Sequence, residues 1–235
     1  METDRKKYMI VMAGGSGTRM GASEPKQFLK LKGKAILHWT IQRIVNAVPD
    51  VKIITVLPAD YINTWKQYCI NNNFYCPQTI VAGGITRFHS VRNGLEKVPD
   101  GALVGIHDGV RPLVSEALIR ELYHRAESRR AVIPITPCTD TMKAVCVKEG
   151  SDGVKYYETI EGINFDRSIM FGAQTPQVFH SEVLKKAYTQ AFDTSFTDDA
   201  SVAAADGVVI SYIEGERLNL KITTPDDLKI ANLFV

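Results

Sequence analysis

The sequence predicts an α/β protein in which a mostly parallel sheet is flanked by helices and carries a protruding β-hairpin arm. Short β-branched runs recur between turn residues, and segments with helical spacing separate these runs. Parallel neighbours need a crossover connection, and a helix is the compact one, so this alternation favours a Rossmann-like arrangement. A break in the alternation from Cys138 to Asp166 predicts the arm.

The predicted strands are five apolar runs bounded by turn residues. They span residues 9–12, 51–57, 79–81, 102–107 and 131–135. Helices are expected between them, where apolar residues recur at helical spacing, and they span residues 37–48, 88–95 and 118–126. The carboxyl ends of parallel strands meet at one edge of a sheet, where ligands of such folds bind. The loops after Met12, Val81 and His107 are therefore the expected site.

The arm is expected to consist of two strands, at 141–148 and 154–160, around a turn at 149–153. An isolated two-stranded ribbon is only marginally stable in water, so it should pack on something, most economically on a second copy of the chain. The arm subregion, residues 138–166, therefore predicts a homodimer.

After the arm the chain is expected to return to the sheet. The expected elements are a helix at 181–191, a helix at 198–205, a strand at 208–213 and a closing helix after Pro225. Thr197 is expected to cap the second of these helices, because a threonine before acidic residues is typical of a helix start. The length of 235 residues predicts a single domain over residues 1–235.

The composition is that of a globular protein, with hydrophobic residues at 45% and charged residues at 23%. Lys and Arg number 28 against 26 Asp and Glu, and a net charge of +2 argues against a nucleic-acid binder. The sequence lacks an apolar run of about 18 residues and a signal peptide, so no membrane association is expected and a cytoplasmic location is predicted. The four cysteines form no C-x-x-C pair and are expected to be reduced thiols.

A glycine-rich segment, residues 12–21, directly follows the first predicted strand, and Pro25 and Lys26 come shortly after it. Glycines let backbone N–H groups converge on an anion, and the charges of Arg19 and Lys26 would surround the same volume. The segment lacks the G-K-[ST] ending of a P-loop and the G-x-G-x-x-G spacing of a dinucleotide-binding turn. The pattern therefore predicts a cradle for a triphosphate.

Further short motifs lie along the rest of the chain. They are Pro25-Lys-Gln-Phe28, Gly83-Gly84 through Ser90-Val91, His107-Asp108 with Arg111-Pro112, Thr139-Asp-Thr-Met-Lys143, Gln174-Thr-Pro-Gln177, Thr197-Asp-Asp-Ala200 and Asn219-Leu-Lys-Ile-Thr223. With residues 13–20, these motifs make the chain resemble the nucleotidyltransferases of the sugar-nucleotide type, and within them the 2-C-methyl-D-erythritol 4-phosphate cytidylyltransferase family of isoprenoid biosynthesis. The resemblance covers nearly the whole chain. It implies transfer of CMP from CTP to 2-C-methyl-D-erythritol 4-phosphate, with release of pyrophosphate.

The resemblance implies catalytic roles for Arg19 and Lys26, which should stabilise the charge that develops as a substrate phosphate oxygen attacks the α-phosphate of CTP. It implies Mg²⁺ as the cofactor, held by Asp108 at the end of a predicted strand, where a carboxylate can fix the ion against triphosphate oxygens. Neighbouring His107 is expected to pack within the strand instead, because Mg²⁺ prefers oxygen ligands.

A further set of residues matches positions that contact the nucleotide in the family. This set is Ala13, Gly14, Gly15, Gly83, Gly84, Ser90 and Asp108. The backbone amides and the serine hydroxyl are expected to contact the edge of the cytosine. The chain departs from the family pattern at Ile85, where relatives often carry an acidic residue, so a base or ribose contact at this position is not implied.

The residues expected to bind the acceptor, a small polyol phosphate, are cationic or hydroxylated. They are Arg111, Thr141, Arg167 and Lys221. An Arg fork together with a Lys suits a phosphate monoester, which carries close to two negative charges. Thr141 and Arg167 lie at or beside the arm, so the resemblance implies that they serve the active site of the partner subunit in a dimer.

Two other functions stay open from the sequence. A ribitol-5-phosphate cytidylyltransferase would share the glycine-rich segment, the aspartate and the Gln174–Gln177 motif, and would differ in a few contacts to the polyol. A non-catalytic nucleotide-sensing module would keep the sheet without the chemistry, although the presence of Arg19, Lys26 and Asp108 argues against it. A nicotinamide-dependent dehydrogenase is disfavoured, because the glycine fingerprint is absent.

Overall fold

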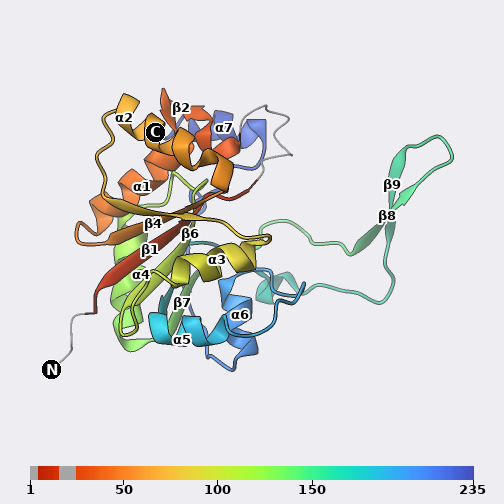
Figure 1. Ribbon diagram of the computed structural model, residues 1–235. Coiled ribbons are helices and arrows are strands. Elements are labelled where there is room, and N and C mark those ends of the chain that lie inside the picture. Colours follow the sequence, from red (N-terminus) through yellow and green to blue (C-terminus); the bar gives the residue numbers. More distant parts are fainter. Residues whose placement is uncertain (1–4, 16–24) are drawn as a thin grey trace.

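The computed structural model describes residues 5–15 and 25–235, and Figure 1 shows a central sheet with helices on both faces. Within these residues the sheet has eight strands, and its order runs β10, β7, β11, β6, β1, β4, β5, with β12 also paired to β7. Five strands confirm the five predicted runs. They are β1 (Lys7–Met12), β4 (Lys52–Leu57), β5 (Gln78–Ala82), β6 (Leu103–Asp108) and β7 (Ala131–Pro137). Strands β1, β4, β5 and β6 are parallel to their neighbours in this group, as predicted.

Two apolar clusters cover the two faces of the sheet. Alternate residues of a strand point to opposite faces. In β1, Met9 and Val11 accordingly join one cluster, whereas Tyr8 and Ile10 join the other. The first cluster contains side chains of α1 (Ile36–Ala47), α2 (Ile62–Asn71) and α4 (Glu116–Ser128), and the second contains those of α3 (Arg87–Leu95), α5 (Ser181–Ala187) and α6 (Asp199–Ala205). Burial on both faces explains why these strands are apolar throughout.

Two strands lie between the arm and α5 that the sequence analysis did not predict. They are β10 (Phe171–Ala173) and β11 (Gln177–His180), and both pair antiparallel with β7. Strand β11 also pairs antiparallel with β6, so it separates the two parallel strands β6 and β7. Each is short, and β11 carries a glutamine and a histidine, so neither shows the β-branched run that marks the other strands.

The predicted boundaries after the arm were partly wrong. Helix α5 ends at Ala187 rather than at 191, because the Thr189 hydroxyl donates to the carbonyl of Lys186 at 2.7 Å and the Gln190 amide donates to that of Ala187 at 2.8 Å. Strand β12 is Ser211–Glu214 rather than 208–213, because the N–H of Val208 instead bonds Ala203 at the end of α6.

The cap predicted for the helix at 198–205 was wrong by one residue. Asp198, not Thr197, caps α6, and its carboxylate accepts the N–H of Ser201 at 2.8 Å. The closing helix α7 (Pro225–Ala231) is confirmed, with Thr224 as its cap.

The described residues also contain five short elements. They are η2 (Lys26–Phe28), β2 (Lys30–Leu31), β3 (Lys34–Ala35), η3 (Ala59–Tyr61) and η4 (Arg167–Ile169).

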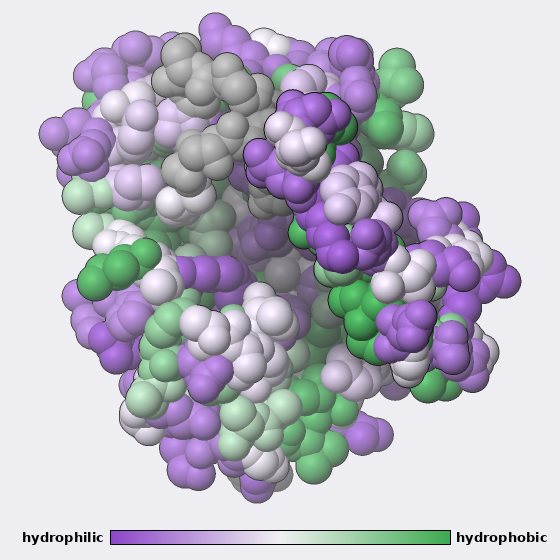
Figure 2. All heavy atoms as spheres, turned by 90° about the vertical axis from the view of Figure 1, so that its right-hand side faces the viewer, coloured by the Kyte–Doolittle hydropathy of each residue, from purple (hydrophilic) through white to green (hydrophobic). Residues whose placement is uncertain are grey.

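The arm projects from the body in Figure 1, and its strands β8 (Val145–Glu149) and β9 (Lys155–Thr159) pair only with each other within the described residues. Both are shorter than predicted, and residues 141–144 lie outside β8, whose first residue, Val145, is paired with the last residue of β9. Figure 2 shows the face from which the arm extends, and apolar residues are exposed on this face. The exposed apolar residues of the arm include Val145, Val147, Val154, Tyr156, Tyr157, Ile160 and Ile163.

All four cysteines are free thiols. Across residues 5–15 and 25–235, no helix is both long and apolar enough to cross a membrane.

Candidate active site

A pocket of about 240 Å³ opens at the carboxyl ends of β1 and β6. Its lining comes from three loops that are far apart in the sequence, together with two further segments. The lining residues are 12–15, 26–27 and 84–87 with Ser90, Asp108, Val110 and Lys221. The structure therefore brings the predicted loops after Met12, Val81 and His107 to one place, as expected for the strand ends of a parallel sheet.

Backbone groups and a serine form the α3 side of this pocket. The Ser90 hydroxyl accepts the N–H of Gly84 at 2.9 Å and donates to the carbonyl of Thr86 at 2.9 Å. A Cβ on Gly84 would lie 2.5 Å from the Cβ of His89, so only glycine fits there. Gly83 lies just behind the lining, and its N–H donates to the carbonyl of Leu57 at 2.7 Å.

The segment that carries Lys26 is fixed on two sides. The buried Gln27 amide donates to the carbonyl of Ala13 at 2.6 Å, which ties η2 to the end of β1. Phe28 stacks on Tyr61 with ring centroids 5.5 Å apart. These contacts hold Lys26 at the pocket lining. Arg19, the other predicted catalytic cation, lies outside the described residues.

Asp108 is the acidic residue among the described lining residues, and it is 7% exposed at the end of β6. Its Oδ2 lies 3.1 Å from the Nζ of Lys221 and 3.1 Å from the Nε of Arg111. Burial alone would raise the pKa of this carboxyl, but the charges of Lys221, Arg111 and Arg87 outweigh burial and hold the pKa well below its usual range. Asp108 is therefore ionised at neutral pH.

Thr175 holds Asp108 and His107 from behind. Its hydroxyl oxygen accepts the N–H of Asp108 at 3.1 Å and lies 3.0 Å from Nδ1 of His107. His107 is fully buried, as predicted, and burial lowers its pKa to about 3, so the ring is neutral. Its Nε2 has no hydrogen-bond partner among the described residues.

Arg111 lies beneath the pocket rather than in its lining. Its Nη1 donates to the carbonyl of Asn219 at 2.7 Å, and Asn219 in turn donates to the carbonyl of Thr175 at 2.9 Å. Asn219 is fully buried. Arg111 thus fixes the Asp108 carboxylate from the side away from the opening, while Lys221 reaches the same oxygen from the lining.

Arg87 adds a cation that the sequence analysis did not single out. It begins α3, lines the pocket, and forms a two-pronged ion pair with Asp199 of α6, at 3.0 Å and 2.5 Å. The Tyr188 hydroxyl donates to the same carboxylate at 2.6 Å. Burial lowers the pKa of Arg87, but the Asp199 charge more than offsets this, so the guanidinium is firmly charged.

Thr141 and Arg167 do not reach the pocket of their own chain. Both are exposed, Thr141 before β8 and Arg167 in η4, where its Nη1 donates to the carbonyl of Thr139 at 3.3 Å. The predicted acceptor-binding set is therefore divided within one chain: Lys221 and Arg111 lie at Asp108, and the other two lie at the arm.

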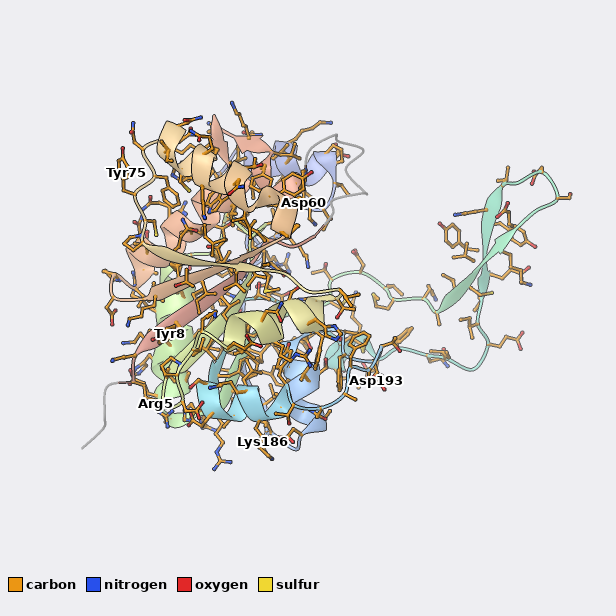
Figure 3. All side chains as sticks on the ribbon, in the orientation of Figure 1. Arg5, Tyr8, Asp60, Tyr75, Lys186 and Asp193 are labelled. Atoms are coloured by element: carbon orange, nitrogen blue, oxygen red, sulfur yellow. The ribbon has the colours of Figure 1, made fainter. Side chains whose placement is uncertain are left out.

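A larger hollow of about 430 Å³ lies where β7 and β12 begin, and we call it the basal hollow. Arg129, Lys186 and Asp206 help to line it, and Lys186 is 3.1 Å from Asp206. An adjoining hollow contains Arg5 and Lys186, and Figure 3 shows both residues at the lower end of the body. Because no residue of the predicted site lines the basal hollow, the smaller pocket is the candidate site.

Several residues of the site belong to motifs whose roles the sequence did not reveal. Gln27, Thr175 and Asn219 all stand in motifs that carried the resemblance, yet their contacts are to backbone groups distant in sequence. Arg87 also lies within such a motif, residues 83–91, but a single arginine at a helix start is ordinary and its partner lies 112 positions away.

The chain is similar over nearly its whole length to proteins of one family. The family model described as 2-C-methyl-D-erythritol 4-phosphate cytidylyltransferase matches residues 8–235. A protein of that name from Bacteroides thetaiotaomicron is 44% identical over 230 residues, which cover 98% of this chain and 100% of the relative. Another from Porphyromonas gingivalis is 43% identical over 233 residues and 99% of each chain. A crystal structure from Francisella tularensis with the same name is 30% identical, has a TM-score of 0.73, and covers 98% of this chain and 100% of that one.

Proposed function

The chain belongs to the 2-C-methyl-D-erythritol 4-phosphate cytidylyltransferase family, and we propose that the pocket at Asp108 is where it transfers CMP from CTP to 2-C-methyl-D-erythritol 4-phosphate. It is a nucleotidyltransferase of isoprenoid biosynthesis. One observation carries the assignment to this pocket: a carboxylate, two lysines and the predicted glycine segments line one cavity.

The donor nucleotide would lie with its base against the α3 side of the pocket. There the backbone of Gly84 lets a ligand approach closely, and Ser90 offers a fixed hydroxyl. Ala13 and Gly14 line the pocket from the loop after β1. A small pyrimidine can be distinguished from a purine by such close contacts, because the larger ring would meet the backbone. Ile85 lines the same pocket and is 96% exposed, so it offers the nucleotide an apolar surface rather than a carboxylate.

The reaction is an in-line displacement at the α-phosphate of CTP. A phosphate oxygen of the acceptor forms the new P–O bond, the bond between the α- and β-phosphates breaks, and pyrophosphate leaves with the bonding electron pair. Such transfers need little covalent help from the protein, so positioned charges supply most of the acceleration. Lys26 would stabilise the charge on the α-phosphate, and Arg19 is proposed to share this role.

The residues present fit a Mg²⁺ ion. The contacts of the Asp108 carboxylate to Lys221 and Arg111 both use Oδ2, which leaves Oδ1 for a ligand. Within residues 5–15 and 25–235 no cluster of His, Cys, Asp or Glu could hold a metal alone. Mg²⁺ commonly binds in this way, through one or two carboxylates together with substrate phosphates. We propose that Asp108 holds the ion, which when bound would neutralise charge on the triphosphate.

The acceptor would lie between the pocket and an arm. Lys221 is the cation that reaches the pocket lining beside Asp108, and it is proposed to bind the acceptor phosphate, with Arg111 fixing Asp108 beneath it. The partner subunit's Thr141 and the partner subunit's Arg167 are proposed to complete the acceptor site. A homodimer would cover the exposed apolar side chains of the arm, which the chain's own body leaves uncovered. We also propose a cytoplasmic location.

The test is release of pyrophosphate from CTP and Mg²⁺ with two acceptors. We expect rapid release with 2-C-methyl-D-erythritol 4-phosphate and little with ribitol 5-phosphate. Equal rates with both polyols, or a preference for ribitol 5-phosphate, would reassign the acceptor. Binding of CTP with no release in either mixture would indicate the nucleotide-sensing module. The family model and the relatives from Bacteroides thetaiotaomicron and Porphyromonas gingivalis carry the methylerythritol name, which favours the first outcome.

A further inference from the structure

The ion pair between Arg87 and Asp199 places a fixed positive charge at the pocket. We propose that Arg87 is a further phosphate-binding residue of this site and that Asp199 is the residue that positions it. The proposal rests on the proposed function for the identity of the nucleotide. It assigns Arg87 a contact with a substrate phosphate, from either the donor triphosphate or the acceptor monoester.

The burial of the pair is uneven. The Asp199 side chain is 0% exposed, whereas the Arg87 side chain is 35% exposed and lines the pocket. A buried carboxylate needs a cation, and a cation enclosed with it would satisfy that need equally well. Here the cation is instead the pocket-facing member, so its charge is available to a ligand.

The guanidinium is held in one orientation. Its Nη1 and Nη2 each donate to one oxygen of Asp199, and Tyr188 fixes that carboxylate from the other side. A two-pronged pair of this kind defines the plane of the guanidinium as well as its position. The other N–H groups of Arg87 form no hydrogen bond to the described residues, and their planar fork matches the oxygens of a phosphate.

The field of Arg87 reaches the floor of the pocket. The Arg87 charge is one of three that hold the pKa of the Asp108 carboxyl low, after those of Lys221 and Arg111. Lys221 and Arg111 both form ion pairs with Asp108, so the carboxylate partly neutralises their charges. Arg87 makes no such ion pair with Asp108, so its charge is available to a phosphate in the pocket.

The test uses a variant that removes both charges. Replacing Arg87 alone would leave a buried carboxylate without a cation and could unfold the protein. The double variant Arg87→Met/Asp199→Asn avoids this, because the Tyr188 hydroxyl can still donate to the amide oxygen. Calorimetry would give the dissociation constants of CTP and of cytidine, which carries no phosphate, and steady-state kinetics would give the KM of the acceptor.

We expect the double variant to fold and to bind CTP about tenfold more weakly, the scale of one charge-assisted hydrogen bond, with cytidine binding within about twofold of the parent. A tenfold rise confined to the acceptor KM would support the proposal with the acceptor as the source of the phosphate. Arg87→Lys, which keeps the charge and loses the fork, should be intermediate. The matched control Arg125→Met/Glu121→Gln removes a surface pair of 2.7 Å and should change none of these constants.

Two results would overturn the proposal. One is a folded double variant in which CTP affinity and acceptor KM both stay within about twofold of the parent, since the pair would then be only structural. The other is an equal loss for CTP and cytidine, since the pair would then only shape the α3 loop. Either result leaves the proposed function intact if the parent protein releases pyrophosphate. A parent that binds CTP without releasing pyrophosphate would instead refute the function while the phosphate contact remained testable.

Discussion

The body around Asp108 and the arm formed by β8 and β9 differ in how far one chain buries and pairs their side chains. In the body, Asp108 is buried and bonded to two cations, and strands are covered on both faces. In the arm, Val147 and Tyr157 are paired across the two strands and are 58% and 69% exposed. The body therefore buries Asp108 and both faces of its strands within one chain, whereas the arm presents a surface that a second chain could complete.

The largest expected effect separates chemistry from stability in the body. Lys26→Met should lower kcat by about a hundred- to a thousandfold, the cost of losing one group that stabilises transition-state charge, and should leave the melting temperature unchanged. Rates of pyrophosphate release and a thermal melt would measure both. Lys30→Met, at an exposed position of nearby β2, is the matched control. A near-normal kcat in Lys26→Met would remove Lys26 from the transition state.

The second prediction tests the arm without touching the body. Val147→Asp/Tyr157→Asp puts charges on the exposed apolar surface of the arm and should give a monomeric mass in light scattering. CTP affinity should stay within about twofold, because the nucleotide pocket belongs to one chain, while turnover should fall about tenfold or more for want of the partner's arm.

The control for the arm variant is Val209→Asp, which changes an 83% exposed valine outside the arm and should leave mass and turnover unchanged. A parent protein that is already monomeric, or a monomeric variant with full turnover, would contradict the role proposed for the arm.

The third prediction concerns how acid lowers the stability of the body. The arm does not enter it, because all five histidines lie outside the arm. Burial, with the charge of Lys34, lowers the pKa of His38 to about 4, and burial lowers that of His107 to about 3, from 6.5. Between pH 6.5 and about 4 the unfolded chain binds protons at both groups and the folded chain does not. The free energy of unfolding should therefore fall by about 1.4 kcal/mol per pH unit for each group as pH decreases.

A single substitution separates the two histidines. His38→Phe keeps a ring stacked on Phe74, since the centroids of the His38 and Phe74 rings are 4.0 Å apart. Denaturant titrations from pH 6.5 to 4 should show that it removes about half of the pH dependence of the unfolding free energy that the two histidines contribute. His124→Phe, at a side chain that is 74% exposed, should leave the slope unchanged. An unaltered slope in His38→Phe would show that this ring is protonated in the folded protein.

The smallest expected effect is at a helix cap beside the pocket. Asp198→Ala should cost about 1 kcal/mol of unfolding free energy, because the carboxylate accepts the N–H of Ser201 at the start of α6. Thr224→Ala, at the cap of α7, should cost a similar amount. Only the first variant adjoins Asp199, so only it should also raise the KM of a substrate. An equal KM in both variants would show that α6 can fray without disturbing Arg87.

The sequence predicted the five parallel strands and the meeting of three loops, because both follow from patterns of a few consecutive residues. The strands β10 and β11 escaped it, since they are short and lack a β-branched run. The ends of α5 and β12 depend on individual hydrogen bonds, such as that from the N–H of Val208 to the carbonyl of Ala203, which no local sequence pattern reveals.

The same distinction applies to the site. Asp108 was recognised because it ends an apolar strand, and Lys26 because it follows a glycine-rich segment. The contacts of Gln27 to Ala13 and of Asn219 to Thr175 join residues 14 and 44 positions apart, so only the fold reveals them. The arm is a two-stranded ribbon, as predicted, but the second copy of the chain that is proposed to cover it cannot be seen in a single chain.

A crystal structure with CTP, Mg²⁺ and an acceptor analogue tests the central claim most directly. We predict a metal ion on the Asp108 carboxylate, cytosine against Gly84 and Ser90, and the α-phosphate beside Lys26. A nucleotide bound in the basal hollow, or a metal ion held away from Asp108, would contradict the account.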